Sequence, residues 1–178
     1  MWPWTDVNNQ EDYEVFILTV DGVHCPTQEP KHPTLSKNSK FYSHKFKQAA
    51  LAYEIGLSVF ENRVLWMNGP FPAATHDVTI FRGALKDRIP AGKRIIADTG
   101  YIGEPGICSI PNSRDPPNLF KFKSRARSRH ETFNSRLKNF KCLAECFRHG
   151  LEKHKIVFEA VCVICQYQME NGSPLYDV

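Results

Sequence analysis

The chain has 178 residues, of which 42% are hydrophobic and 24% are charged, so its length and composition favour one domain with a substantial core. Its formal net charge of +4 is too small to identify a binding partner. No apolar run approaches the ~20 residues of a membrane-spanning helix and the N-terminus lacks a secretory signal, which excludes a membrane-spanning protein and predicts a soluble intracellular one.

The first part of the chain predicts strands. Residues 15–20 are almost continuously apolar, as expected of a strand covered on both faces. The proline-containing segment 23–40 predicts a long loop. Residues 47–59 and 63–67 then predict two strands that form a hairpin, turning at residues 61–62.

The second part predicts mainly helices. Apolar residues recur every three or four positions after Asp77, which predicts an amphipathic helix that ends before Pro90. The elements expected after it are a strand at 93–97, a loop at 99–120, and helices at about 128–148 and 151–170. This order indicates a single α/β domain over residues 15–178, preceded by a tail at 1–14 that carries Trp2 and Trp4.

Two of the predicted strands lead into an aspartate that is followed closely by glycine: Asp21 before Gly22, and Asp98 before Gly100. We expect both acids at the carboxyl ends of their strands, where open α/β sheets bind ligands. Carboxylates are suitable ligands for Mg²⁺ or Mn²⁺, and two such ions ~3.5–4 Å apart can activate a nucleophile and stabilise a leaving oxygen at a phosphodiester. Either aspartate alone is more typical of a turn.

Two further acids have competing interpretations. Asp77 stands just before the helical pattern, so it is either an N-cap or a direct metal ligand. Glu131 lies on a basic helical pattern, nearly opposite an apolar stripe that includes Phe133 and Leu137. Periodicity alone therefore predicts a solvent-facing Glu131, and only a cleft beside that face would make it catalytic.

Positive charge is concentrated in the second half of the chain. Between residues 114 and 155, twelve Lys or Arg stand against four Asp or Glu. In the segment 121–129 a basic residue recurs at every second position, which favours salt-dependent contact with nucleic-acid phosphates over a merely solvated segment. The candidate nucleic-acid-binding residues are Lys121, Lys123, Arg125, Arg127, Arg129, Arg136 and Lys138.

The cysteines allow a second metal hypothesis. Cys142 and Cys146, then Cys162 and Cys165, flank two histidines and resemble zinc-ligand pairs. The second pair lies within an apolar helical pattern that lacks the turn of a zinc knuckle, so structural zinc is not favoured. We expect the six cysteines to be thiols in a reducing compartment.

Four segments, in order, resemble those of the Harbinger-type DDE transposases. They are Val-Asp-Gly at 20–22, a His-Asp segment at 75–81, Ala-Asp-Thr-Gly-Tyr at 97–101, and a glutamate helix at 127–138 in which Arg-Leu-Lys follows the acid. Asp98 and Glu131 are 33 positions apart, which is close to the spacing typical of this superfamily. The resemblance extends over most of residues 15–170.

The resemblance implies a ribonuclease-H-like mixed sheet flanked by helices, with Asp21, Asp98 and Glu131 as catalytic ligands of Mg²⁺ or Mn²⁺. Asp98 is preferred to Asp77 as the second acid because it follows the fourth strand, and Asp77 then supports the metal ligands. The resemblance also implies DNA as partner and a nuclear location. The helical DNA-binding region that precedes the core in family members is absent, so a separate DNA-recognition protein is an expected partner.

The leading hypothesis is therefore a DDE-type nuclease that cleaves DNA and carries out strand transfer with a divalent metal. The alternative is a domesticated, non-catalytic DNA- or protein-binding module that retains the fold. Target sequence and oligomeric state are open at this stage.

Overall fold

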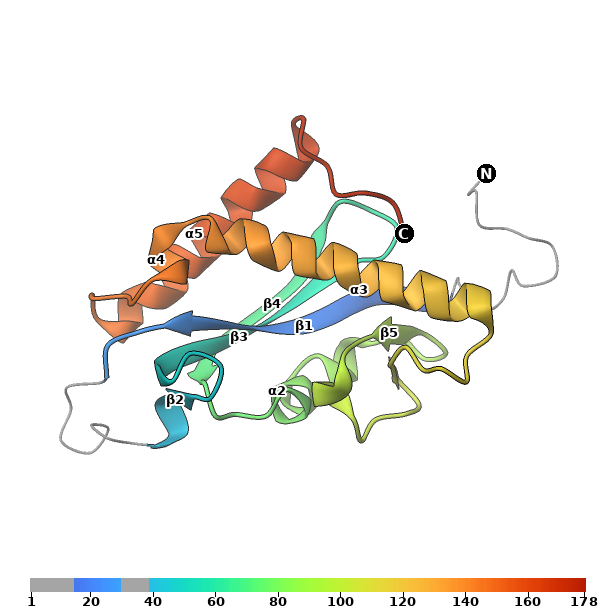
Figure 1. The fold of residues 1–178 in the computed structure, drawn as a ribbon, viewed down its shortest axis with the longest axis horizontal. Helices are drawn as coiled ribbons and strands as arrows, with labels where there is room; N and C mark the ends of the chain where they lie inside the picture. The colour runs from blue at the N-terminus through green and yellow to red at the C-terminus, as the bar shows by residue number, and fades with distance from the viewer. Residues whose placement is uncertain (1–14, 30–38) are drawn as a thin grey trace.

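The computed structural model describes residues 15–29 and 39–178, and its centre is a mixed β-sheet (Figure 1). The strands are β1 (Phe16–Pro26), β2 (Tyr42–Ser43), β3 (Gln48–Ser58), β4 (Val64–Pro72), β5 (Arg94–Ile96) and β6 (Cys108–Ser109). β3 pairs antiparallel with β1, β4 and β2, whereas β1 with β5 and β5 with β6 are parallel. The predicted α/β class is confirmed, and the sheet is compatible with a ribonuclease-H-like fold.

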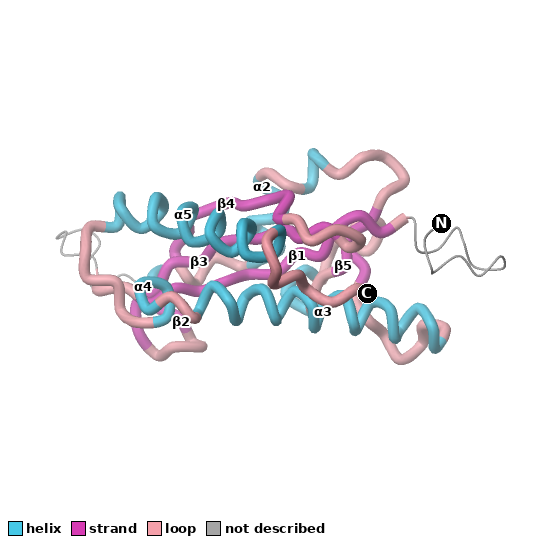
Figure 2. The backbone as a smooth tube through the Cα atoms, turned by 90° about the horizontal axis from the view of Figure 1, so that it is seen from above, coloured by secondary structure: helices cyan, strands magenta, loops and turns pink. Residues whose placement is uncertain are grey.

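Helices cover both faces of this sheet. They are α2 (Asp77–Gly83), α3 (Pro117–Lys138), α4 (Lys141–Ala144) and α5 (Leu151–Glu170), with short 3-10 turns at Ser39–Phe41, Lys86–Arg88 and Thr99–Tyr101. α3 and α5 lie on one face and α2 on the other (Figures 1 and 2). In the described residues, no helix combines the length and apolar character needed to cross a membrane.

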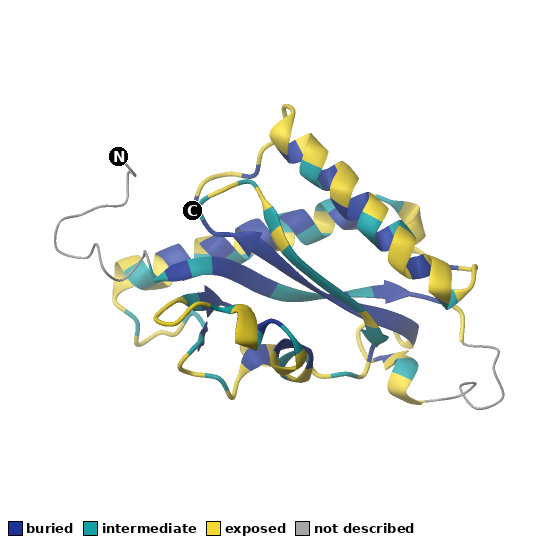
Figure 3. Ribbon diagram, turned by 180° about the vertical axis from the view of Figure 1, so that it is seen from behind, coloured by how far each residue is buried: buried dark blue, intermediate teal, exposed yellow. Residues whose placement is uncertain are grey.

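Two core clusters fix these layers because alternate residues of a strand point to opposite faces. On one face, Val23 and Tyr53 pack with Phe133 and Phe158 of α3 and α5. On the other face, Val20 and its neighbours pack with residues of α2 and of the 3-10 turn Thr99–Tyr101. Figure 3 shows the central strands almost completely buried between these layers.

β1 is longer than predicted, and this changes the position of Asp21. The strand continues to Pro26 because Val23 and Cys25 are buried and pairing with β3 persists to Pro26, so Asp21 lies in mid-strand. The expectation that Asp21 ends its strand was wrong. Pairing with β5 covers only the stretch from Phe16 to Thr19, however. Beyond it, no strand of the described residues pairs with that edge of β1 until Phe147 donates to the Pro26 carbonyl.

The hairpin at 47–67 is confirmed, but its second strand, β4, continues past the predicted end at residue 67 to Pro72. The strand at 93–97 is confirmed with small shifts of boundary, and the last helix has the predicted bounds. The predicted helix at 128–148 was wrong at both ends. α3 begins at Pro117, which suits the first helical turn because backbone N–H groups there have no partner within the helix. It ends at Lys138, and the backbone of Phe140 is extended. The helix after Asp77 stops at Gly83, although Leu85 is buried as its spacing suggested.

The predicted loop at 99–120 also contains β6, which is too short for a periodic signal. The tail at 1–14, with Trp2 and Trp4, lies outside the described residues, as does the part of the predicted loop at 30–38.

Candidate active site

A cleft of about 610 Å³ opens where β5 leaves the edge of β1 unpaired. Its walls come from β1, from one face of α3, from the start of α2, from the turn after β5 and from the turn between β2 and β3. Four acids from four separate parts of the chain line it: Asp21, Asp77, Asp98 and Glu131. Glu131 therefore does not face away from the two aspartates, although 64% of its side chain is exposed.

Asp21 is held from two sides within the cleft. Its Oδ1 accepts a hydrogen bond from the Gly22 N–H at 2.9 Å, and its Oδ2 accepts one from the Asn134 side-chain amide on α3 at 2.8 Å. Burial, followed by the negative charge of Asp98, raises the pKa of Asp21 to about 6. The acids of the cleft therefore oppose one another's ionisation, and a bound cation would relieve this repulsion.

Asp77 and Asp98 meet around Gly100. A Cβ built on Gly100 would lie 2.5 Å from Asp77 Oδ2 and 3.0 Å from Asp98 Oδ1, so both oxygens lie close to the same point. A Cβ on Gly22 would lie 2.6 Å from Asp77 Oδ1. The two glycines that follow the strand acids thus make room for the Asp77 carboxylate.

The local backbone geometry tests the interpretation of Asp77 as an N-cap and of Asp98 as a turn residue. The interpretation of Asp77 as an N-cap was wrong, because His76 occupies that position and Asp77 is the first helical residue. Burial and then Asp98 raise the pKa of Asp77. Asp98 lines the cleft and also caps a turn. Its Oδ1 accepts a hydrogen bond from the Gly100 N–H at 2.7 Å at the start of a 3-10 turn.

Glu131 reaches the cleft from α3. The preceding residue, His130, is buried, and its Nδ1 lies 2.8 Å from the Thr19 hydroxyl on β1, which fixes this turn of α3 beside Asp21. Glu131 Oε1 lies 3.7 Å from an Arg127 guanidinium nitrogen one turn earlier. This pair is exposed, so it holds Glu131 only weakly.

The donors of the cleft suit a hard divalent cation. They are carboxylate oxygens, and Asn134 adds a buried Oδ1 that has no hydrogen-bond partner. Within the described part of the chain, however, no three His, Cys, Asp or Glu residues already lie close enough to hold a metal ion. The residues therefore fit such an ion by chemistry and by shared location, and the side chains would have to draw together to ligate it.

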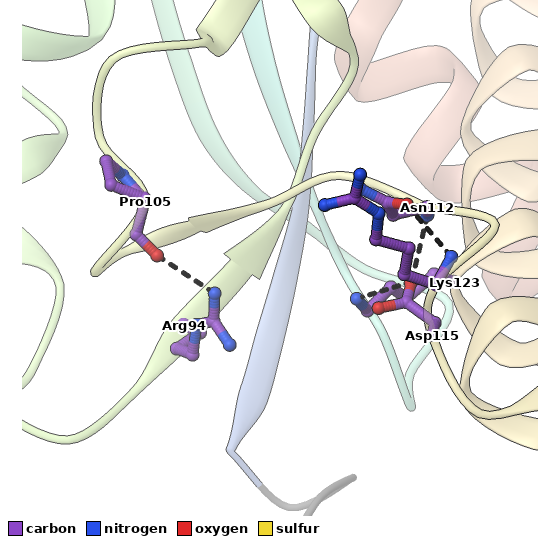
Figure 4. Close-up of polar contacts among 6 residues, drawn as sticks. Arg94, Pro105, Asn112, Asp115 and Lys123 are labelled. Carbon is purple, nitrogen blue, oxygen red and sulfur yellow. Dashed lines mark hydrogen bonds and ion pairs between the residues drawn. The ribbon is translucent and has the colours of Figure 1, made fainter.

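The predicted nucleic-acid-binding residues separate into different environments, because the segment 121–129 is helical and its basic residues do not share one face. Lys123 is buried and its ammonium lies 2.9 Å from Asp115 (Figure 4). Arg129 is also buried and donates to the backbone oxygens of Ser58 and Glu61. These two side chains are built into the fold and do not face a ligand.

Three more of these residues are bonded to the backbone elsewhere. Arg125 donates to the Asp177 carbonyl, Arg136 to those of Ser173 and Pro174, and Lys138 to those of His24 and Leu143. Lys121 is exposed, and Arg127 lines the cleft beside Glu131. Lys138 lines it as well.

Several residues that line the cleft were not among the predicted site residues. Asn134 was accessible to sequence reasoning, because residues three apart on a helix share a face and Asn134 follows Glu131 by three. His24 and Lys45 also line the cleft, but neither belongs to a recognisable pattern in the sequence. Of the cysteines considered for zinc, Cys162 and Cys165 are buried in the core that α5 contributes to.

Comparison with known proteins supports one assignment. The family model described as "DDE superfamily endonuclease" matches residues 20–166, which is most of the chain and includes all four acids of the cleft. No curated protein and no solved structure matches the chain.

Proposed function

The chain belongs to the DDE superfamily endonuclease family, and from this premise we propose that it cleaves DNA phosphodiester bonds with Mg²⁺ or Mn²⁺. The observation that carries the proposal is the shared cleft: Asp21, Asp98 and Glu131 are far apart in sequence and line one cavity. We further propose a transposase of the Harbinger type and a nuclear location, both from the resemblance of the four motif segments.

Each acid has a distinct role in this proposal. Asp21 and Asp98 would share the metal, and Glu131 would complete its coordination from α3. When bound, the metal would supply an activated oxygen nucleophile and charge stabilisation for the leaving oxygen. Asn134 would orient Asp21 through its amide, and Asp77, which lies beside Asp98 at Gly100, would be a further acid next to the metal ligands. Water as nucleophile gives strand cleavage, and a DNA 3′-hydroxyl gives strand transfer.

Nicking of supercoiled DNA tests this proposal. We expect wild-type protein to nick plasmid DNA in Mg²⁺ or Mn²⁺ and not in EDTA. Asp21→Asn and Glu131→Gln should each lower the nicking rate at least 100-fold, since removing a ligand that stabilises transition-state charge typically costs about 10²–10³ in rate. Gel electrophoresis of relaxed and supercoiled plasmid gives the rates.

Glu145→Gln is the matched control for Glu131→Gln. Glu145 is a similarly exposed glutamate whose carboxylate also lies 3.7 Å from a basic residue four positions earlier, but it does not line the cleft. It should nick at the wild-type rate. Equal nicking by wild type and Asp21→Asn would refute the assignment of the acids.

The alternative function is a DNA- or protein-binding module that has lost catalysis. The observation that favours it is that no three of the described acids are already close enough to ligate a metal. It predicts salt-sensitive DNA binding with no nicking in any divalent ion. The same experiment therefore separates the two functions.

A further inference from the structure

The cleft extends beyond the four acids to a second, positively charged end. Consecutive residues of β1 from Asp21 to His24 line it, which is about 10 Å of strand. On α3 the lining continues to Lys138 and Asn139, and the turn between β2 and β3 contributes Lys45. One strand of duplex DNA carries a phosphate every ~3.4 Å along its axis, so a cleft of this length has room for more than one phosphate.

Two of the three strong cations in the cleft already have protein partners. The Lys138 ammonium donates to the carbonyls of His24 and Leu143 and lies 3.6 Å from the Cys25 sulfur. Arg127 is paired with Glu131. Lys45 is exposed, and in residues 15–29 and 39–178 no hydrogen bond or ion pair engages its ammonium.

The turn that carries Lys45 is anchored to β1. Ser43 is fully buried, its hydroxyl lies 3.0 Å from His24 Nδ1, and its carbonyl accepts the Lys47 N–H at 2.8 Å. The Phe46 ring lies under the Lys138 ammonium at 5.4 Å. The backbone on both sides of Lys45 is therefore fixed relative to the cleft, and only its own side chain is free to follow a ligand.

The charge of Lys45 acts on both ends of the cleft. It contributes to lowering the pKa of His24, after burial, and it opposes the rise in the pKa of Asp77. The charge of Lys45 is near enough to the acids to change the pKa of Asp77, and no direct partner among the described residues neutralises it.

We propose that Lys45 binds a backbone phosphate of the DNA strand next to the carboxylates and so positions that strand in the cleft. The inference rests on the proposed function for its substrate, and Lys45 is a binding residue with no part in the chemical step. Contact with a phosphate carries no sequence information, so it should strengthen binding equally for all sequences.

DNA affinity without cleavage tests the proposal. Fluorescence anisotropy with a labelled duplex of arbitrary sequence, in EDTA, gives the affinity over a range of salt concentrations. Lys45→Gln should weaken binding by a similar factor for different sequences and reduce the slope of log K against log salt by about 1. Lys45→Arg should retain both affinity and slope.

Lys47→Gln is the control, because Lys47 is an exposed lysine of the same turn that does not line the cleft. It should bind as wild type does. Wild-type affinity and slope in Lys45→Gln, or equal losses in both variants, would overturn the inference. Because the assay needs no cleavage, a failure to nick DNA would defeat the proposed function and leave this result standing.

Discussion

Glu54 is the only carboxyl group among the buried side chains of the described residues, at 1% exposure. It lies opposite Gly22 in the β1–β3 pair, so it points to the face that Asp77 occupies, directly behind the cleft. The Trp66 indole N–H donates to its Oε2 at 2.8 Å, while its Oε1 has no partner. Burial raises the pKa of Glu54 to about 7.

This raised pKa predicts a pH-dependent gain in stability for Glu54→Gln. The folded pKa lies above the ordinary glutamate value of 4.5, so folding takes up a proton and wild-type stability falls as pH rises from about 4.5 to about 7. Glutamine keeps an acceptor for Trp66 and cannot ionise. The variant should match wild type at pH 4 and exceed it by on the order of 2 kcal/mol at pH 8, measured by urea unfolding.

Glu61→Gln provides the comparison, since Glu61 is an exposed glutamate of the adjacent turn. Replacing this exposed carboxyl should change stability by no more than about 0.5 kcal/mol. If the stability difference between Glu54→Gln and wild type is the same at pH 4 and pH 8, Glu54 does not take up a proton on folding.

At the level of single residues, the sequence was informative where motifs exist. Asp21, Asp98 and Glu131 each stand in a segment with a recognisable pattern, and all three line the cleft. Lys45 could not be found in this way, because no sequence pattern marks it. It lines the same cleft as Asp77 only because β3 pairs with β1, which places the turn before β3 beside the end of β1. Such a contact is a property of the packed sheet.

Helix α3 shows how one element serves both the fold and the cleft. Glu131 and Asn134 line the cleft, whereas the Arg129 guanidinium is buried on another side of the helix. Arg129 donates to the Ser58 carbonyl at 2.7 Å and to the Glu61 carbonyl at 2.6 Å, and so ties α3 to the turn between β3 and β4.

Replacing Arg129 should therefore lower stability. Arg129→Met keeps the aliphatic stem but leaves two carbonyls without their donor, which should cost about 2–4 kcal/mol in urea unfolding. Lys121→Met, at an exposed position of the same helix, should change stability by less than about 0.5 kcal/mol. Similar stability for both variants would show that the buried hydrogen bonds of Arg129 are not structural.

The bounds of α3 explain why its first turns were not predicted. The segment 121–129 was considered only for its alternate basic residues, but Phe122, Ala126, Phe133 and Leu137 are buried at helical spacing. This apolar stripe begins at Phe122, between the predicted loop at 99–120 and the predicted helix start at about residue 128. The helical spacing of these apolar residues was visible in the sequence, but the basic residues between them drew the interpretation toward phosphate binding. The last helix had no competing pattern, and its bounds were predicted correctly.

In the molecule as a whole, the sheet and the helices concentrate opposite charges in one cavity. Four acids from β1, α2, the turn after β5 and α3 meet there, with Lys45 and Arg127 at the margins. Such crowding of acids destabilises the fold when they ionise, because each carboxylate is partly removed from water and faces like charge. Burial and the charge of Asp98 raise the pKa of Asp21 for this reason. A divalent cation that binds only the folded state should therefore both stabilise the protein and compete with protons.

This competition gives a prediction that does not depend on catalysis. Mn²⁺ at 100 times its Kd should stabilise the wild type at pH 8 by about 2.7 kcal/mol, visible as a rise in Tm. At pH 5 Asp21, with a pKa of about 6, is mostly protonated, so metal must displace a proton and the rise should be clearly smaller. Asp21→Asn should show little rise at either pH, whereas Asp87→Asn, an exposed acid outside the cleft, should behave as wild type. An equal rise for wild type and Asp21→Asn would mean that the metal binds elsewhere, and the cleft would lose its role as the metal centre.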